Sequence, residues 1–341
     1  MTPRTVLIYA GQELMGDGFI KLPFARALRA AHPGAHITWL AGKGRTVFAH
    51  ELAPLVDGVL DAVIENAGVG SEAGELFGTR PLAGRPFDLV IDTQSRVLTT
   101  LIVRRIDHAR FVSPTANFWF SDARPPRGYH KPPHLHHRLF DIAALAVGHA
   151  VKDPGPLPLP EAFRAEAARL LPDGATYVGF APGAGNREKC WPLDGYMALA
   201  QQQAARGRTP VFILGPNERE WHATLTAAVP GARFPNQEPG ASVSALLTLA
   251  LAGRLAAAVT GDGGAGHILA EGGAPMVSLW GPTDVQKFHP RARRLKIVRA
   301  QSYGGDTMDR IPVEAVAAAL DALLADPTLD DKPAFVSRVF G

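Results

Sequence analysis

The sequence contains a single cysteine, Cys190, among its 341 residues. An internal disulfide is thereby excluded, and such sparse cysteine is typical of a reducing compartment. Long apolar runs are also missing. The longest lightly charged stretch, residues 241–261, contains Arg254 and fits a helix followed by a strand better than a membrane span. The apolar run Val6–Ala10 is too short for the core of a signal peptide. We therefore expect a cytoplasmic protein without a transmembrane segment.

The sequence also lacks an excess of one charge. Its formal net charge is +3, and no lysine-rich stretch of the kind used by nucleic-acid-binding proteins is present. The twelve histidines show no regular metal-ligand spacing. Gly42-Lys43 is not part of a Walker loop, because Ile37 stands where the first glycine should be. Nucleic acid is therefore not an expected partner, and no metal site is predicted.

Hydrophobic residues make up 46% of the chain, enough for sizeable cores, and the length predicts two domains. In the first half, apolar runs that predict strands alternate with amphipathic segments that predict helices. The expected strands are 5–10, 36–40, 59–64, 87–92 and 109–112, and the expected helices are 19–31, 45–52, 96–106 and 134–147. Such alternation is typical of an α/β domain with a parallel sheet.

Four prolines between Lys152 and Pro160 interrupt regular structure and predict a linker. The alternation then resumes. The expected helices are 161–171, 193–206, 218–228, 243–252, 265–271 and 312–325, and the expected strands are 176–181, 210–214, 255–260 and 276–280. We predict an amino-terminal domain over 1–151, the linker over 152–160 and a carboxyl-terminal domain over 161–326. Residues 327–341 form a tail that could pack back on the first domain.

Residues 255–284 carry the strongest local pattern, a strand, a glycine-rich turn, a helix and a second strand. A turn at the carboxyl end of a parallel strand and the amino end of a helix is suited to binding phosphate. Gly261, Gly263 and Gly266 match a dinucleotide-binding fingerprint, with Asp284 downstream, so an NAD-dependent enzyme is one alternative. The late position of the pattern argues against it, since that fingerprint belongs in the first βα turn of its domain.

Three other loops follow predicted strands and carry polar residues. Asp17 either caps the helix that follows it or acts as a catalytic acid or base. Gly183 and Gly185 allow close backbone approach, and Lys189 could neutralise a diphosphate, although a solvated loop would have the same composition. Glu218 either accepts hydrogen bonds from a nucleoside or is an ordinary first-turn glutamate.

Taken together, these segments resemble glycosyltransferase family 9, the ADP-heptose:lipopolysaccharide heptosyltransferase family, over nearly the whole chain. The matching elements are Gly16-Asp17 with Pro23, Pro182-Gly183-Ala184-Gly185 with Lys189 and Trp191-Pro192, Gly215-Pro216 with Glu218, Asp262 with Gly264 and His267, and Gly281-Pro282-Thr283-Asp284. The last two are similar to the strongest signature of the family.

The resemblance implies a GT-B fold, with two Rossmann-like domains whose parallel sheets face each other across a cleft. It implies a donor nucleotide sugar on the second domain and an acceptor on the first. Asp17 would be the general base and Lys189 a diphosphate contact. The other implied donor-binding residues are Gly183, Gly185, Glu218, Asp262, Gly263, Gly264 and His267. The implied donor is an ADP-sugar, which is a substrate, so no cofactor is expected.

Three positions depart from the family pattern. Gly263 replaces the usual threonine, Gly266 stands where serine is common, and Cys190 replaces a larger polar residue. These departures bear on the identity of the donor more than on the type of reaction. The sequence has no Asp-x-Asp element of the kind found in metal-dependent transferases. Asp330 and Asp331 do not form one, because they are adjacent. We therefore expect an inverting, metal-independent transfer.

The acceptor is predicted from the stretch 104–138, which holds seven Arg or Lys and two acids around Phe118-Trp119-Phe120. Arg104, Arg105 and Arg110 are its candidate acceptor-binding residues. A basic, aromatic surface suits an anionic glycolipid at the cytoplasmic face of the inner membrane, and a solvated loop with a few core aromatics is the alternative. A protein-modifying heptosyltransferase and a non-catalytic nucleotide-sugar-binding homologue also remain open.

Overall fold

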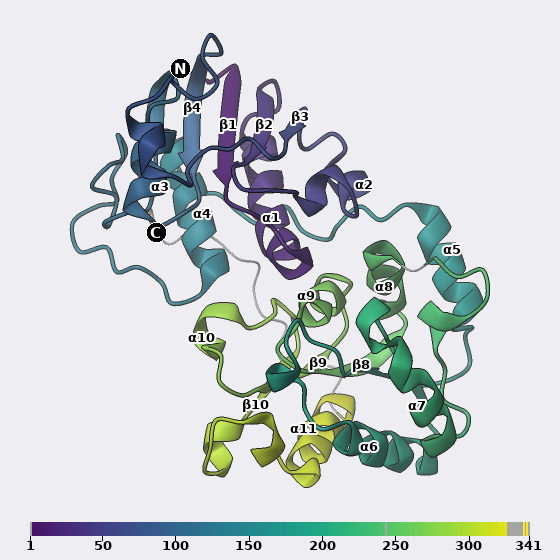
Figure 1. Ribbon diagram of the computed structural model, residues 1–341. Coiled ribbons are helices and arrows are strands. Elements are labelled where there is room, and N and C mark those ends of the chain that lie inside the picture. The colour runs from purple at the N-terminus through teal and green to yellow at the C-terminus, as the bar shows by residue number, and fades with distance from the viewer. Residues whose placement is uncertain (1, 243, 326–336, 338, 340–341) are drawn as a thin grey trace. The chain divides into compact units, whose positions relative to one another are not determined.

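The computed structural model describes residues 2–242, 244–325, 337 and 339. The chain forms two compact units, each an α/β structure with its own sheet (Figure 1). The first unit extends to Gly155 and includes Ser337 and Val339, and the second begins at Pro156. Most of the predicted tail, 327–341, lies outside the described residues. Ser337 donates its backbone N–H to the carbonyl oxygen of Val151, at 3.1 Å, within the first unit.

The first unit contains a five-stranded parallel sheet in the order β3-β2-β1-β4-β5. Its strands are β1 (Thr5–Ala10), β2 (His36–Ala41), β3 (Ala62–Ile64), β4 (Phe87–Asp92) and β5 (His108–Val112). Its longer helices are α1 (Met15–Ala31), α3 (Val97–Val103) and α4 (Leu135–Val147). Val6–Tyr9 is fully buried because the central strand of a parallel sheet is covered on both faces.

Two predictions for this unit were wrong in detail. The helix expected over 45–52 is instead a short 3₁₀ turn, η1 (Val47–Ala49), followed by α2 (Ala53–Val56). Thr46 caps the turn by accepting the N–H of Phe48, and Pro54 lies at the start of the next helix, where its missing N–H is not needed. Helix α1 begins at Met15, earlier than predicted, so Asp17 lies inside its first turn.

The second unit contains a second five-stranded parallel sheet, in the order β10-β9-β8-β6-β7. Its strands are β6 (Tyr177–Ala181), β7 (Thr209–Phe212), β8 (Leu255–Thr260), β9 (Met276–Trp280) and β10 (Leu295–Arg299). Its helices are α5 (Glu161–Leu170), α6 (Leu193–Ala205), α7 (His222–Ala228), α8 (Ala245–Ala252), α9 (Gly264–Glu271), α10 (Val285–Phe288) and α11 (Val313–Ala325). The predicted α/β class with parallel sheets is confirmed.

Strand β10 was not predicted from the sequence. It is an edge strand of five residues that includes Lys296 and Arg299, so its apolar signal is weak. The helix predicted over 218–228 is a 3₁₀ segment, η4 (Pro216–Trp221), followed by α7. The helix predicted over 243–252 begins at Val243, which lies outside the described residues. The observed helix, α8, begins at Ala245.

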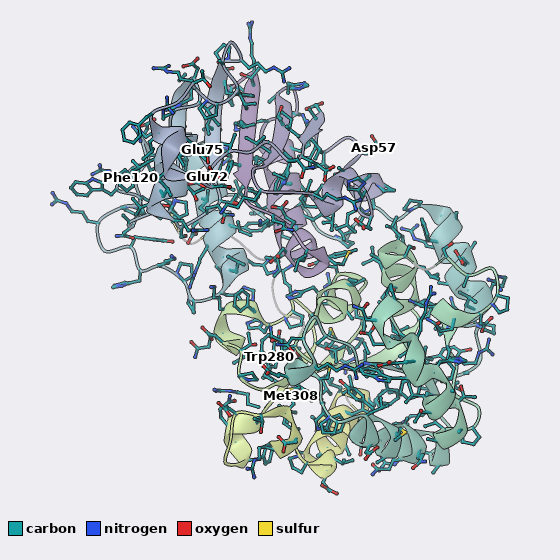
Figure 2. All side chains as sticks on the ribbon, viewed as in Figure 1. Asp57, Glu72, Glu75, Phe120, Trp280 and Met308 are labelled. Atoms are coloured by element: carbon teal, nitrogen blue, oxygen red, sulfur yellow. The ribbon has the colours of Figure 1, made fainter. Side chains whose placement is uncertain are left out.

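Each sheet is the centre of its unit's core. Figure 2 labels Trp280 and Met308, which are both almost fully buried in the second unit. A side chain at Gly281 would come within 2.9 Å of the sulfur of Met308, so only glycine fits the turn after β9. No described helix combines the length and apolar character needed to cross a membrane.

Candidate functional site

The predicted donor-binding residues lie in three loops of the second unit and on the first turns of α9, the helix after the third loop. These loops follow β6, β7 and β8, and β6 lies between β7 and β8 in the sheet. Because the strands are parallel, their carboxyl ends lie at one edge. The loop after β6 includes a 3₁₀ turn, η3 (Arg187–Lys189), and carries Gly183, Gly185 and Lys189. The fold therefore brings residues separated by up to 84 positions, Gly183 and His267, to a single sheet edge.

Glu218 and Gly183 connect the loops after β7 and β6. The Oε2 atom of Glu218 accepts the N–H of Gly215 at 2.9 Å. A side chain at Gly183 would come within 2.4 Å of the Glu218 carboxyl carbon, so glycine is required for this approach. Burial raises the pKa of Glu218, although the Gly215 N–H and Arg187 act in the opposite direction. The carboxylate is thus held at the loop interface by a backbone donor.

Lys189 and Asp262 connect the loops after β6 and β8. The Nζ atom of Lys189 lies 3.0 Å from Oδ2 of Asp262. The Asp262 side chain is only 12% exposed, and this oxygen has no hydrogen-bond partner among the described residues. The contact is therefore an ion pair without hydrogen-bond geometry. The partly exposed Lys189 ammonium group could therefore leave Asp262 and pair with a bound anionic ligand.

The surroundings of Gly263 explain why this chain has glycine where the family usually has threonine. A Cβ atom at this position would lie 2.9 Å from the carbonyl oxygen of Gly183 and 3.2 Å from Cα of Ala184. The backbone of the loop after β6 therefore occupies the space of a threonine side chain. In this chain the two loops touch through their backbones, and Gly263 is the N-cap residue of α9.

We predict that Gly263→Thr destabilises the protein by about 1–3 kcal/mol, the usual cost of forcing extra atoms into a packed site. Urea unfolding measures this change. Gly185→Ala, in the facing loop after β6, is the control, since no atom lies within 4 Å of a Cβ built there. Equal stability of the two variants would show that the loop moves aside at little cost.

His267 lies on the first turns of α9, the helix after the glycine corner. Its side chain is partly accessible, yet the burial of the imidazole lowers its pKa to about 4. Asp262 opposes this shift and His289 adds to it. The imidazole is therefore neutral at neutral pH and can both donate and accept a hydrogen bond.

Two other charged residues of this unit have structural partners. Arg187 pairs with Glu220 and lies over the ring of Trp221, with 5.1 Å between the guanidinium carbon and the ring centroid. Asp284 is the N-cap of α10 and accepts the N–H of Gln286 at 3.0 Å. Lys189 is therefore better placed than Arg187 to exchange its partner for a ligand.

Asp17 lies in the first unit, near the carboxyl end of β1 and in the first turn of α1. Its carboxylate accepts the N–H of Leu14 in a long contact of 3.4 Å. The side chain is half-buried. The predicted capping interaction is thus present, with Asp17 at the third helical position rather than at the N-cap. The role of Asp17 as a catalytic base stays a prediction.

The three candidate acceptor residues are all hydrogen-bonded to the protein. Arg104 donates to the carbonyl oxygen of Phe120 and pairs with Asp122, and Arg105 donates to the carbonyl oxygens of Glu75 and Gly78. Arg110 donates to carbonyl oxygens at the carboxyl end of α4, Leu145 at 2.8 Å and Ala146 at 3.1 Å. Arg104 and Arg105 follow α3, a helix that returns to the amino ends of the strands. Asp17 lies at the opposite edge of that sheet.

Sequence reasoning missed two buried polar groups in this unit. Asp92, at the end of β4, accepts hydrogen bonds from Thr100 at 2.6 Å and Ser113 at 2.9 Å, and burial raises its pKa to about 6. Glu13 forms a 2.8 Å ion pair with Lys21. The only sequence signal for Asp92 is an acid at the end of an apolar strand. Glu13 precedes α1 and forms an isolated β-bridge with Thr46, so helical spacing gave no signal for its pairing with Lys21.

The geometry of the second unit suits binding of a phosphorylated ligand. A lysine, a helix amino terminus and several glycine backbones lie together at one sheet edge, and two carboxylates can accept hydrogen bonds from hydroxyl groups. The first unit supplies a carboxylate near the end of its own central strand.

Comparisons with solved structures bear on the fold. Among solved structures, the glycosyl transferase family 9 protein from Veillonella parvula is 19% identical, with a TM-score of 0.69 over 94% of this chain and 97% of that chain. E. coli ADP-heptose lps heptosyltransferase II is 18% identical, with a TM-score of 0.65 over 94% and 98%. E. coli heptosyltransferase WaaC with ADP is 20% identical, with a TM-score of 0.66 over 94% and 99%. These likenesses confirm the GT-B fold.

No curated protein matches the chain in a sequence search. The model of glycosyltransferase family 9 (heptosyltransferase) matches residues 79–312, more than half of the chain. This stretch contains the loops after β6, β7, β8 and β9. The resemblance found in the sequence motifs is thereby confirmed, and the chain belongs to glycosyltransferase family 9, the heptosyltransferase family, as a glycosyltransferase.

Proposed function

We propose that this protein transfers a heptose, or a related sugar, from an ADP-sugar to an acceptor of the lipopolysaccharide core or lipid A–Kdo type. The observation that carries the donor side is the meeting of Lys189, Asp262 and Glu218 at one sheet edge beside the amino end of α9. The names of two similar E. coli structures, ADP-heptose lps heptosyltransferase II and WaaC with ADP, support the choice of nucleotide and sugar.

In the proposed reaction the acceptor hydroxyl oxygen attacks the anomeric carbon of the donor sugar. Asp17 takes the hydroxyl proton, and the bond between the anomeric carbon and the diphosphate breaks with its electron pair leaving on ADP. Lys189 and the N–H groups at the start of α9 stabilise the charge on that leaving group. Attack from the face opposite ADP inverts the configuration. No step of this mechanism requires a metal ion.

The acceptor side of the proposal is supported by a surface loop of the first unit. Ala116, Asn117 and Phe118 all have left-handed backbone conformations, with φ between 49° and 64°. Phe118 is buried by this turn, whereas the Trp119 side chain is 69% exposed and Arg124 lies over its ring. An exposed tryptophan beside arginine suits the headgroup region of an anionic membrane. We infer peripheral association with the cytoplasmic face of the inner membrane.

A nucleotide screen tests the donor assignment. We expect ADP to raise the melting temperature, GDP and UDP to raise it less, and NAD to give no more than its ADP portion provides. Turnover with ADP-, GDP- and UDP-sugars in the same buffer then identifies the donor. Greater stabilisation by NAD than by ADP would overturn the transferase proposal in favour of a dinucleotide enzyme.

A further inference from the structure

A cavity of about 520 Å³ lies within the first unit, at the carboxyl ends of β2 and β3. Its walls are the loop 42–44 after β2, the loop 66–68 after β3, and the turn that contains Ser71, Glu72 and Glu75. This volume is in the range of small-molecule sites. Asp17 follows β1, which neighbours β2, so the cavity and the proposed base share one sheet edge.

The backbone of this cavity is fixed by hydrogen bonds. The N–H of Val69 donates to the carbonyl oxygen of Gly42, and that of Asn66 donates to Gly44 at 3.0 Å. The Tyr9 hydroxyl donates to the carbonyl oxygen of Val69 at 2.7 Å, and Thr99 donates to Gly70 at 2.8 Å. The walls are therefore formed in advance of any ligand, which lowers the entropy cost of binding.

Glu75 closes the rim of the cavity. Its carboxylate accepts the N–H groups of Gly70 at 2.8 Å and of Ser71 and Glu72 at 2.7 Å. Burial raises its pKa, but these three donors and Lys43 outweigh that effect, so the pKa is lowered and the group stays ionised. Glu75 therefore shapes the turn and leaves a fixed negative charge at the wall.

Lys43, Asn66 and Glu72 are exposed at the same cavity, and Ser71 is half-buried. Together these side chains offer both hydrogen-bond donors and hydrogen-bond acceptors. The formal charges of Lys43, Glu72 and Glu75 add up to a single negative charge, which disfavours an anion. Mixed donors and acceptors around a glycine-walled, preformed cavity fit the hydroxyl groups of an uncharged sugar.

We propose that this cavity binds a neutral, hydroxyl-rich sugar ring of the acceptor, and that Lys43 and Glu72 recognise its hydroxyl groups. The inference rests on the proposed glycosyl transfer, because it specifies which sugar ring of the acceptor lies beside Asp17. In this inference the anionic groups of the glycolipid bind outside the cavity. Within the acceptor types of the proposed function, this selects a core sugar without a carboxylate over Kdo.

Binding measured without donor tests the cavity directly. Methyl heptopyranoside and free Kdo are titrated by saturation-transfer NMR into the wild type, Lys43→Met and Glu72→Gln. We expect the neutral glycoside to bind more tightly than Kdo, and each variant to weaken glycoside binding about tenfold or more, because Lys43→Met removes a charged donor and Glu72→Gln replaces a charged acceptor by a weaker neutral one. Asp57→Asn is the control, since Figure 2 shows Asp57 apart from the neighbouring Glu72 and Glu75.

Two outcomes overturn the inference: unchanged glycoside binding in both variants, or tighter binding of Kdo than of the glycoside. Calorimetric titration with ADP is carried out on the same proteins and should give equal affinities, because the ADP-binding residues belong to the second unit. Failure of the wild type to bind ADP would refute the proposed function while leaving the sugar titration interpretable. The two proposals therefore fail in different measurements.

Discussion

Replacing Asp17 by asparagine is expected to lower turnover about 100-fold or more while ADP affinity stays within a few-fold. The carboxylate is the proposed base for the acceptor hydroxyl, and loss of general base catalysis has effects of this size. Asparagine keeps a side-chain oxygen that can accept the Leu14 N–H, so the start of α1 should survive. Turnover measured with an ADP-sugar and calorimetry with ADP test both parts.

The stability of this variant separates catalysis from capping. Asp17 is the acidic residue in the first turn of α1, and the helix dipole favours it there by about 0.3–1 kcal/mol. Asp17→Asn should therefore lose no more than about 1 kcal/mol in urea unfolding. Near-normal turnover together with a larger loss of stability would reduce Asp17 to a helix-capping residue.

The sequence predicted the strands at the centre of each sheet well, because they are buried on both faces. Val6–Tyr9 and Ala257–Thr260 are short apolar runs next to glycine-containing loops, a local pattern that needs no knowledge of partners. Edge strands were harder. β10 has two charged residues, Lys296 and Arg299, among its five, and β3 has only three residues.

The contacts inside the donor site could not be predicted from motifs. The pairing of Lys189 with Asp262 and the contact of Gly263 with Gly183 join residues about 73 to 80 positions apart. Their geometry depends on the order of β6, β7 and β8 in the sheet, which a single sequence does not encode locally. The replacement of the family threonine by Gly263 was visible in the sequence, but its reason required the structure.

The acceptor side shows why charge composition alone is a weak guide. Arg104, Arg105 and Arg110 stood out as a basic stretch, yet each guanidinium is used to bond the protein's own carbonyl groups. Their role in acceptor binding stays a prediction. The cavity beside Lys43 could not be recognised from a sequence motif, because backbone hydrogen bonds between two loops form it.

Lys189→Ala should weaken ADP binding by about 1.5–3 kcal/mol, the range for a hydrogen bond to a charged group. That change corresponds to roughly 10- to 150-fold in the dissociation constant. Besides the lost cation, the variant leaves the poorly exposed carboxylate of Asp262 without its ion-pair partner, next to the expected diphosphate. Both effects oppose an anionic ligand. Unchanged ADP affinity by calorimetry would place the diphosphate elsewhere.

Arg187→Ala is the matched control, because Arg187 is a cation of the same 3₁₀ turn that already pairs with Glu220 and stacks on Trp221. We expect its effect on ADP affinity to be clearly smaller than that of Lys189→Ala. Equal losses in the two variants would indicate a general effect of positive charge rather than a specific contact.

Asp262→Asn completes a double-mutant cycle with Lys189→Ala. In the free protein Asp262 competes with the ligand for Lys189, at 3.0 Å, so removing its charge should leave ADP affinity unchanged or raise it. The double variant should then bind ADP more tightly than Lys189→Ala alone, because the unpaired carboxylate is gone. The intact ADP-sugar should behave differently. The family resemblance implies that Asp262, Gly264 and His267 contact the sugar and phosphates of the donor, so binding of the ADP-sugar should weaken in Asp262→Asn. Weaker ADP binding in Asp262→Asn would instead show that this carboxylate holds Lys189 in position for the diphosphate.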